Sequence, residues 1–313
     1  KRHTPILARK RLMLKKVLQR LLQALKLLFR WCQYFAKTDN KLQLVKYFYF
    51  LLIHPFFAKK KANSLFKVSD LPSFRPLLLK ALSWDFELYK RLAEPQTLGL
   101  RLWEYGALLS NASLKGKEVL DIGVGTSLLP FYLADKHSTK VTALDLPQPM
   151  ENPYQARIKD NPLVNYKSGS VIKLPFKNES YDAVLAISTL EHLDADYQSM
   201  QPISYSKFID STRKAIQEMI RVTRPGGLIY ITTDFYHPQQ KTDRWQSQVN
   251  YSGRIGGAYK QKDLSIFTQL FAQNNLQPIG KPEYNLNKLT SSSSYSNYRG
   301  RYITTANFLY KKP

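Results

Sequence analysis

The segment VLDIGVGTS at residues 119–127 constrains the fold of this chain more than any other feature. An apolar run that contains one acid, Asp121, ends at two glycines, Gly123 and Gly125, which stand one residue apart. A loop that only changed direction could use a single glycine, so the pair indicates that another group comes close to this backbone. The segment 127–136 follows directly and is expected to form a helix. Free backbone amides and the positive helix end would then lie at the carboxyl end of a β-strand, where they can hold a ligand.

The C-terminal two thirds of the chain alternates expected strands with expected helices. The strands fall at 118–122, 141–145, 163–166, 182–187 and 228–232, and the helices at 127–136 and 206–223, after a helix that begins near Leu98. This alternation is typical of a parallel sheet covered by helices on both faces. Residues 301–310 also alternate, and we expect them to form an edge strand that joins the sheet last. The predicted fold is therefore α/β, with a doubly wound, mostly parallel sheet.

A second acid follows the glycine loop at a spacing typical of a ribose-binding carboxylate. Asp145 ends the second expected strand, 20 residues after Gly125, and a carboxylate there can accept hydrogen bonds from both hydroxyls of a ribose. The pairing indicates a cofactor that contains adenosine. A dinucleotide loop would place a third glycine at the sixth position from Gly123, which is Leu128 here. Asp121 would repel a diphosphate but attract an ammonium group, so the loop favours S-adenosylmethionine over NAD.

Basic residues are concentrated in the N-terminal third. The formal net charge is +24, and residues 1–92 hold 21 Lys and Arg against four acids, which leaves +7 for the rest. Residues 10–37 place apolar side chains on one helical face and Lys, Arg and Gln on the other, with no acid before Asp39. Four roles are open for residues 10–57: packing on the rest of the protein, lying on an anionic membrane surface, binding RNA, or serving as a targeting peptide. We divide the chain into a basic helical extension, 1–92, and a second domain, 93–313.

The composition excludes several kinds of site. A single cysteine, Cys32, rules out an internal disulfide and a cysteine-based zinc cluster, and the five histidines show no metal-ligand spacing. The aromatic run at 47–53 is far shorter than the roughly 20 residues that cross a bilayer. We therefore expect no metal and no membrane span. The expected location is the cytoplasm, peripheral on the membrane if the basic extension binds lipid.

With these residues in place, residues 98–313 resemble the class I S-adenosylmethionine-dependent methyltransferases that act on small molecules. The motifs that carry the resemblance are, in chain order, VLDIGVGTS, Asp145, SGSVIKLPF at 168–176, SYDAV at 180–184, STLEHL at 188–193 and RPGG at 224–227. The resemblance implies a seven-stranded Rossmann-like sheet, S-adenosylmethionine as cofactor, and a small-molecule, sugar or lipid-like methyl acceptor. Three alternatives stay open: an RNA methyltransferase that uses the basic extension, a scaffold that retains the fold without catalysis, and an NAD-dependent oxidoreductase.

The resemblance also identifies candidate cofactor-binding residues. The family commonly has an acid at the position of Ser170, where it contacts the adenine amino group, so the Ser170 hydroxyl and the Val171 amide take its place as candidates. The full set of expected cofactor-binding residues is Tyr105, Asp121, Gly123, Gly125, Thr126, Asp145, Leu146, Ser170, Val171 and Ser188.

Methyl transfer from a sulfonium is an in-line displacement that depends mainly on alignment of the reacting atoms. A base is needed only where the acceptor must lose a proton early. The candidates for that role are His192, which follows the fourth strand, and Asp234 and His237, which follow the fifth. Two insertions, 194–208 and 235–262, are expected to shape the acceptor pocket, and the second contains glycines that would let it act as a lid.

Overall fold

The structure of the chain is a computed structural model. It describes residues 95–125, 127, 129–147, 161–196, 201–236, 258–284, 296–298 and 301–313. The expected basic extension, 1–92, with its candidate membrane surface at 10–57, lies outside these described residues. Thr126, His237 and the expected lid also lie outside them, apart from the first and last residues of the 235–262 insertion.

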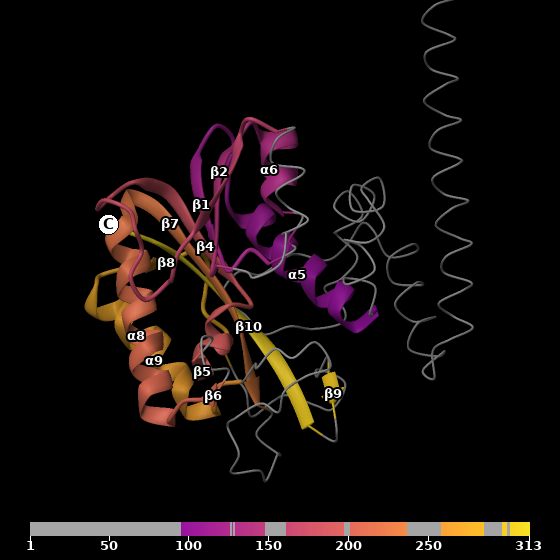
Figure 1. Cartoon of the computed structure of the whole chain (residues 1–313), viewed down its shortest axis with the longest axis vertical. Coiled ribbons are helices and arrows are strands. Elements are labelled where there is room, and N and C mark those ends of the chain that lie inside the picture. The colour runs from indigo at the N-terminus through magenta and orange to yellow at the C-terminus, as the bar shows by residue number, and fades with distance from the viewer. Residues whose placement is uncertain are drawn as a thin grey trace, which may run out of the picture.

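A twisted sheet forms the centre of the described part (Figure 1). Its strands are β1 Glu118–Ile122, β2 Lys140–Asp145, β3 Val164–Ser168, β4 Tyr181–Ile187, β7 Thr223–Tyr236, β8 Gln277–Pro278, β9 Ser296–Tyr298 and β10 Arg301–Lys311. They pair in the order β3-β2-β1-β4-β7-β10-β8, and β9 pairs with β10 beside this path. The pairs from β3 to β7 are parallel, whereas β10 is antiparallel to its neighbours. A small separate sheet joins β5 Ala195–Asp196 to β6 Gln201–Pro202.

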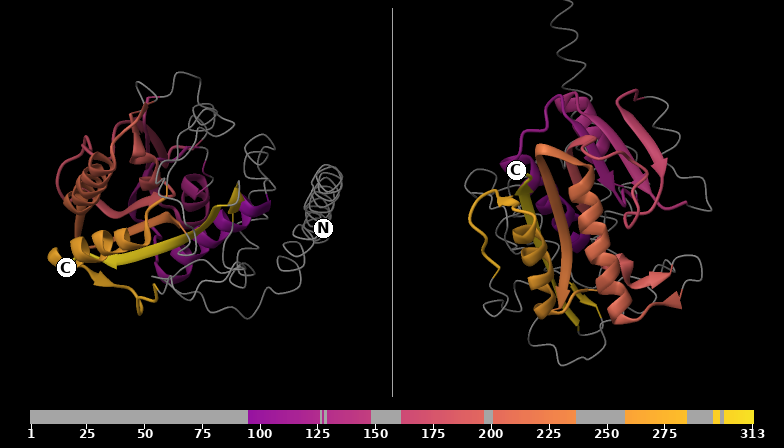
Figure 2. Two further views of the ribbon diagram at one scale, coloured as in Figure 1. Left: turned by 90° about the horizontal axis from the view of Figure 1, so that it is seen from below. Right: turned by 90° about the vertical axis from the view of Figure 1, so that its left-hand side faces the viewer.

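Helices cover both faces of this sheet, as Figures 1 and 2 show. The helices are α5 Pro95–Asn111, α6 Leu129–His137, α8 Tyr205–Val222 and α9 Leu264–Gln273, with short 3₁₀ helices η2 Leu190–Asp194 and η3 Gln261–Asp263. The α8 and α9 helices lie side by side on one face, and α5 and α6 lie on the other. This arrangement confirms the predicted doubly wound, mostly parallel sheet with seven strands along its path.

One predicted feature of the sheet is wrong. Residues 301–310 were expected at an edge, but β10 lies between β7 and β8. Its residues from Thr304 to Tyr310 are all buried, because α9 packs over one face of the strand and α5 contacts it as well. Phe308 stacks on Phe267 of α9 with ring centroids 4.8 Å apart. Both faces of β10 are therefore buried over this stretch, although β8 pairs with the strand only at Tyr310 and Lys311.

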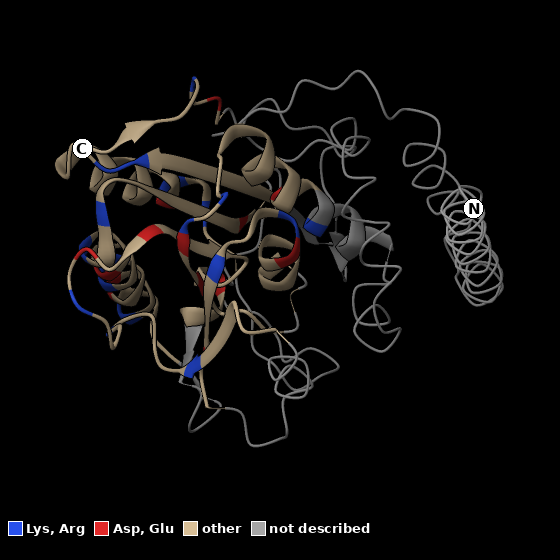
Figure 3. Ribbon diagram, turned by 90° about the horizontal axis from the view of Figure 1, so that it is seen from above, with Lys and Arg blue, Asp and Glu red and all other residues tan. Residues whose placement is uncertain are grey.

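The fold brings the carboxyl ends of β2, β1, β4 and β7 together along one edge of the sheet. At that edge β7 extends beyond its last pair with β4, Thr232 with Ile187, and continues to Tyr236 against β10 alone. Lys and Arg of the described part are spread over several helices, strands and loops (Figure 3). This edge carries the loops that contain most of the predicted site residues.

Candidate active site

The two glycines of the loop after β1 are required for different structural reasons. Gly123 adopts φ +66°, and a Cβ there would overlap the side chain of Thr189, whose own Cβ would lie 2.9 Å away. Thr189 is fixed in that place because its hydroxyl donates to the Ile122 carbonyl at 2.9 Å. Gly125 adopts φ +49°, and the nearest described atom to a Cβ there is the Gly123 carbonyl oxygen at 4.0 Å. The first glycine is therefore required by packing, and the second leaves the loop backbone accessible.

The Asp145 carboxylate meets this loop directly. The Gly125 amide donates to Asp145 Oδ2 at 2.7 Å, and the Leu146 amide donates to Asp145 Oδ1 at 2.8 Å. Each carboxylate oxygen can accept more than one hydrogen bond, so both retain capacity for further donors such as ribose hydroxyls. The structure thus brings the loop glycine and the predicted ribose acid into contact.

The predicted adenine-contacting residues lie next to the same acid. The Gly169 amide donates to the Asp145 carbonyl at 2.9 Å, which places the following residues, Ser170 and Val171, beside the end of β2. Ser170 is partly exposed and its carbonyl accepts from the Lys173 amide at 3.2 Å, whereas Val171 is buried. These two residues are therefore positioned by backbone hydrogen bonds.

Asp121 carries an oxygen that lacks a partner within the described part of the chain. Only 2% of the residue is exposed, and its Oδ2 atom is buried with no hydrogen bond there. Burial, with a smaller effect from the negative charge of Asp145, raises the pKa of Asp121 to about 7, and the nearby Arg101 opposes the shift. A buried acceptor of this kind fits a cationic donor, such as the ammonium group of S-adenosylmethionine.

Helix α5 closes over the loop through Tyr105. The Tyr105 hydroxyl and the Ser127 hydroxyl lie 2.8 Å apart, and Ser127 Oγ accepts from the Leu129 amide at 3.1 Å. Burial raises the pKa of Tyr105 to about 12, so the phenol stays protonated at neutral pH. Tyr105 therefore lies at the loop, and its hydroxyl links α5 to the start of α6.

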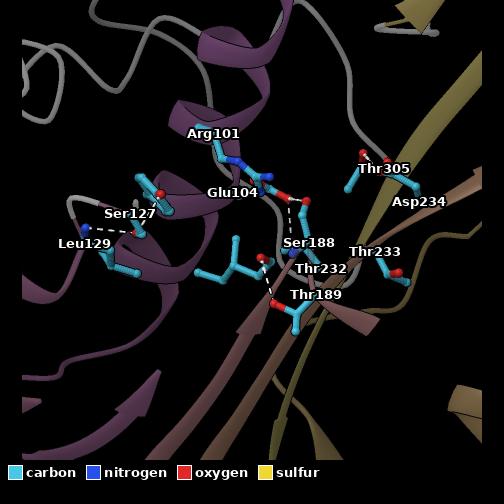
Figure 4. A network of polar contacts seen from close by, with 12 residues as sticks. Arg101, Glu104, Ser127, Leu129, Ser188, Thr189, Thr232, Thr233, Asp234 and Thr305 are labelled. Atoms are coloured by element: carbon cyan, nitrogen blue, oxygen red, sulfur yellow. Dashed lines mark hydrogen bonds and ion pairs between the residues drawn. The ribbon is translucent and has the colours of Figure 1, made fainter. Parts of the chain in front are cut away.

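A buried carboxylate that sequence reasoning missed joins three elements at this edge (Figure 4). Glu104 on α5 is fully buried, and its Oε2 accepts from Arg101 Nη1 at 2.7 Å. Its Oε1 accepts from the Ser188 hydroxyl at 2.7 Å and from the Thr232 hydroxyl at 2.5 Å. Ser188, one of the predicted cofactor-binding residues, stands just after β4 with φ +45°. The acid in the otherwise apolar sequence LWEYGALL was the available signal for Glu104.

Two of the predicted bases lie at the ends of β4 and β7. His192 is partly exposed in η2, where its amide donates to the Thr189 carbonyl at 3.1 Å. Asp234, near the end of β7, accepts from the Thr305 hydroxyl of β10 at 2.6 Å through Oδ1. The third, His237, follows directly after β7 and lies outside the described residues.

Glu191, the residue before His192, was also missed as a site residue. It is 2% exposed, and its Oε2 accepts from the Thr233 hydroxyl at 2.8 Å. Burial raises the pKa of Glu191 to about 7, although Thr233 and the charge of Arg101 favour the ionised form. An acid between Leu190 and His192, just after an apolar strand, was the signal that could have identified it.

Two further kinds of feature are absent from the described residues. They contain no group of three or more His, Cys, Asp or Glu side chains arranged to hold a metal ion. Among them, no helix combines the length and the apolar character needed to cross a membrane.

Comparison with known proteins shows which proteins this chain is similar to. Residues 120–231 match the model of the methyltransferase domain family. A segment of 131 residues is 28% identical to the O-methyltransferase resE of Aspergillus sclerotiorum and covers 41% of this chain and 43% of that one. A segment of 140 residues is 30% identical to the demethylmenaquinone methyltransferase of Renibacterium salmoninarum and covers 44% and 49%.

The chain thus spans about half the length of the curated relatives it matches. Among solved structures, geranyl diphosphate methyltransferase in complex with S-adenosylmethionine superposes with a TM-score of 0.49 at 15% identity, over 72% of this chain and 90% of that chain.

Proposed function

We propose, on the premise that this chain carries a class I S-adenosylmethionine-dependent methyltransferase domain, that it methylates a small-molecule acceptor. S-adenosylmethionine, when bound, supplies an electrophilic methyl group on a sulfonium leaving group. The chain itself then has to bind the nucleoside, hold the acceptor in line with the methyl group and exclude water. Alignment of this kind can contribute about 7–11 kcal/mol to lowering the barrier.

The observation that carries this proposal is the 2.7 Å hydrogen bond from the Gly125 amide to Asp145. It joins the glycine loop to the acid that ends the next strand. In our proposal Asp145 binds the ribose hydroxyls, and the unpartnered Oδ2 of Asp121 accepts from the ammonium group of the cofactor. Gly123 is proposed to border the amino-acid end of the cofactor, and Thr126, outside the described residues, stays a predicted contact.

The other predicted residues take roles that their positions support. Ser170, Val171 and Leu146 lie around the end of β2 and are proposed to contact the adenine. Ser188 is held by Glu104 and is proposed to line the side of the pocket nearest the methyl group. Tyr105 closes the pocket from α5.

Three residues are proposed to accept or orient the acceptor's proton. Asp234 is the best supported, because Thr305 orients its carboxylate and β7 carries it beyond the end of β4. A carboxylate that already accepts one hydrogen bond can accept a second from an acceptor hydroxyl. His192 and His237 follow the same two strands and are the alternatives.

We further propose that the acceptor is a hydroxyl-bearing small molecule of sugar or lipid-like character. The support is the sequence similarity to a protein described as an O-methyltransferase. If the acceptor is lipid-like, the basic residues 10–57 would serve to rest the protein on an anionic membrane. An RNA acceptor is the competing possibility, with the same basic residues contacting phosphates.

The test uses S-adenosylmethionine labelled in its methyl group and three acceptor pools: water-soluble metabolites, extracted lipids and total RNA. We expect label in a small-molecule product from one of the first two pools, and none with the Asp145→Ala variant. Label confined to RNA would contradict the proposed acceptor class. If the wild type transfers no label to any of the three pools and also fails to bind S-adenosylmethionine, the proposed function itself is contradicted.

A further inference from the structure

The pairing of β4 with β7 ends before two of the residues proposed to handle the acceptor's proton. Its last pair is Ile187 with Thr232, and the Ser188 amide adds a hydrogen bond to the Thr232 carbonyl at 3.0 Å. Asp234 lies two residues further along β7, and His192 lies in η2, which follows β4. The relative position of Asp234 and His192 therefore depends on contacts other than this pairing.

Tyr259 supplies such a contact from the segment that precedes η3. Its amide donates to the Asp234 carbonyl at 2.8 Å, and its carbonyl accepts from the Tyr236 amide at 2.9 Å, so its backbone pairs with the end of β7. Its hydroxyl donates to the Leu190 carbonyl at 3.0 Å, in η2 two residues before His192. One residue thus joins the strand that carries Asp234 to the short helix that carries His192.

The Tyr259 ring is enclosed by aromatic side chains from three elements. The residue is fully buried, and its ring stacks on Phe208 of α8 with ring centroids 4.8 Å apart. The rings of Phe235 on β7 and Phe267 on α9 lie at centroid distances of 5.6 Å and 5.1 Å. The Thr212 hydroxyl of α8 lies 2.8 Å from the Tyr259 hydroxyl. This packing fixes the direction of the Tyr259 hydroxyl toward η2.

The backbone after Tyr259 is anchored independently of that hydroxyl. Asp263 is 3% exposed, and it accepts from the Lys260 amide at 2.7 Å through Oδ2 and from the Tyr205 hydroxyl through Oδ1. The Lys260 ammonium also lies 5.2 Å from the centroid of the Tyr205 ring, within the range of a cation–π contact. Because β7 and the start of α8 both hold this segment, removal of the hydroxyl alone should leave Tyr259 in place.

Resting on the proposed function, we propose that Tyr259 is a positioning residue, which sets the place of η2 relative to Asp234 so that the acceptor is held in line with the methyl group. It acts through its hydrogen bond to the Leu190 carbonyl. The Thr233 hydroxyl, which donates to Glu191 at 2.8 Å, also links β7 to η2. Loss of the Tyr259 hydroxyl should therefore loosen η2 without detaching it. A misplacement of about 1 Å can cost about 100-fold in rate, so a partial loosening should cost about tenfold.

The first measurement is hydrogen exchange of the full chain without added ligand, followed by mass spectrometry. Tyr259→Phe removes the hydroxyl and keeps the ring. Amides of η2 should then exchange about three- to tenfold faster than in the wild type, because this segment loses one hydrogen bond. Tyr284→Phe is the matched control, since the Tyr284 hydroxyl also donates to a backbone carbonyl, that of Asn307 on β10, at 3.1 Å. It should leave the exchange of η2 unchanged.

The second measurement is the initial rate of label transfer from saturating methyl-labelled S-adenosylmethionine to the metabolite or lipid extract that the wild type labels. We expect the rate of Tyr259→Phe to fall about tenfold. Its affinity for S-adenosylmethionine, measured by calorimetry, should stay within about twofold of the wild type, because the proposed nucleoside site lies at β1 and β2. Tyr284→Phe should change neither quantity. A residue that only stabilised the fold would not separate rate from cofactor affinity.

Unchanged exchange of η2 in Tyr259→Phe would overturn this inference and leave the proposed function intact. A transfer rate within about twofold of the wild type, a parallel loss of cofactor affinity, or an equal loss of rate in Tyr284→Phe would also overturn it. If the wild type labels neither extract, the proposed small-molecule acceptor and this inference are both contradicted.

Discussion

At the scale of single residues, packing distinguishes two glycines that look alike in the sequence. Gly123 and Gly125 form one Gly-x-Gly pattern, yet only Gly123 is enclosed by another side chain, that of Thr189. The sequence predicts that a loop here needs glycine, because the pattern follows an apolar run with an acid. It could not predict that Thr189, 66 residues later in the chain, is the group that comes close.

Gly123→Ala should destabilise the protein by about 2–4 kcal/mol, since it combines a positive φ with an overlap against Thr189. Gly226→Ala is the matched control, because Gly226 has φ +74° but no atom within 4 Å of a Cβ. Its cost should be that of backbone conformation alone, about 1 kcal/mol. Urea denaturation measures both values. Equal losses would show that the Thr189 contact contributes nothing.

Glu104 and Glu191 show where residue-level prediction fails. Both acids are visible in the sequence, but their hydroxyl partners come from residues 42 to 128 positions away in the chain. Asp121 and Asp145 stand out in the sequence because the first precedes the glycine loop within β1 and the second ends β2. An acid on a helix before the first strand has no comparable local pattern.

At the scale of elements, Arg221 holds the segment SGSVIKLPF at 168–176 against α8. Its guanidinium donates to the Phe176 carbonyl at 2.8 Å and to the Leu174 carbonyl at 3.1 Å, and pairs with Glu218 at 2.6 Å. The Leu174 amide in turn donates to Glu218 at 2.7 Å. This arrangement holds the segment that begins at Ser170, beside the proposed adenine site.

Replacing Arg221 by alanine should lower the free energy of unfolding by about 1–3 kcal/mol, because two backbone carbonyls lose a charged donor. The guanidinium is partly exposed, so water can replace some of the lost bonds and the lower half of this range is expected. Lys214→Ala, on the exposed face of the same helix, should change the free energy of unfolding by less than about 0.5 kcal/mol. A loss as small for Arg221→Ala as for the control would contradict the anchoring role.

The helices and strands could be predicted best where a run of apolar residues coincides with a buried strand. The expected strand 118–122 coincides with β1, and 182–187 differs from β4 by one residue. The place of β10 could not be predicted, because sequence pattern indicates that a strand is buried but not which neighbours bury it. Its insertion between β7 and β8 depends on α9, whose aromatic side chains cover one face.

At the scale of the whole molecule, function depends on the edge where four parallel strands end. The order of the strands brings Asp145, Asp121, Glu191 and Asp234 to one edge of the sheet from positions that span residues 121 to 234 of the chain. The loop and the first acids of this edge were predicted from the sequence, and their contact is a product of the fold. The central claim is that Asp145 and the glycine loop together bind S-adenosylmethionine.

The affinity of the Asp145→Ala variant for S-adenosylmethionine, measured by calorimetry beside the wild type and the surface variant Asp210→Asn, tests this claim most directly. Loss of two charge-assisted hydrogen bonds to the ribose should weaken binding by about 100-fold or more, whereas Asp210→Asn should bind as the wild type does. An affinity of Asp145→Ala within about twofold of the wild type would contradict the claim, because a ribose held by Asp145 cannot lose that carboxylate without cost.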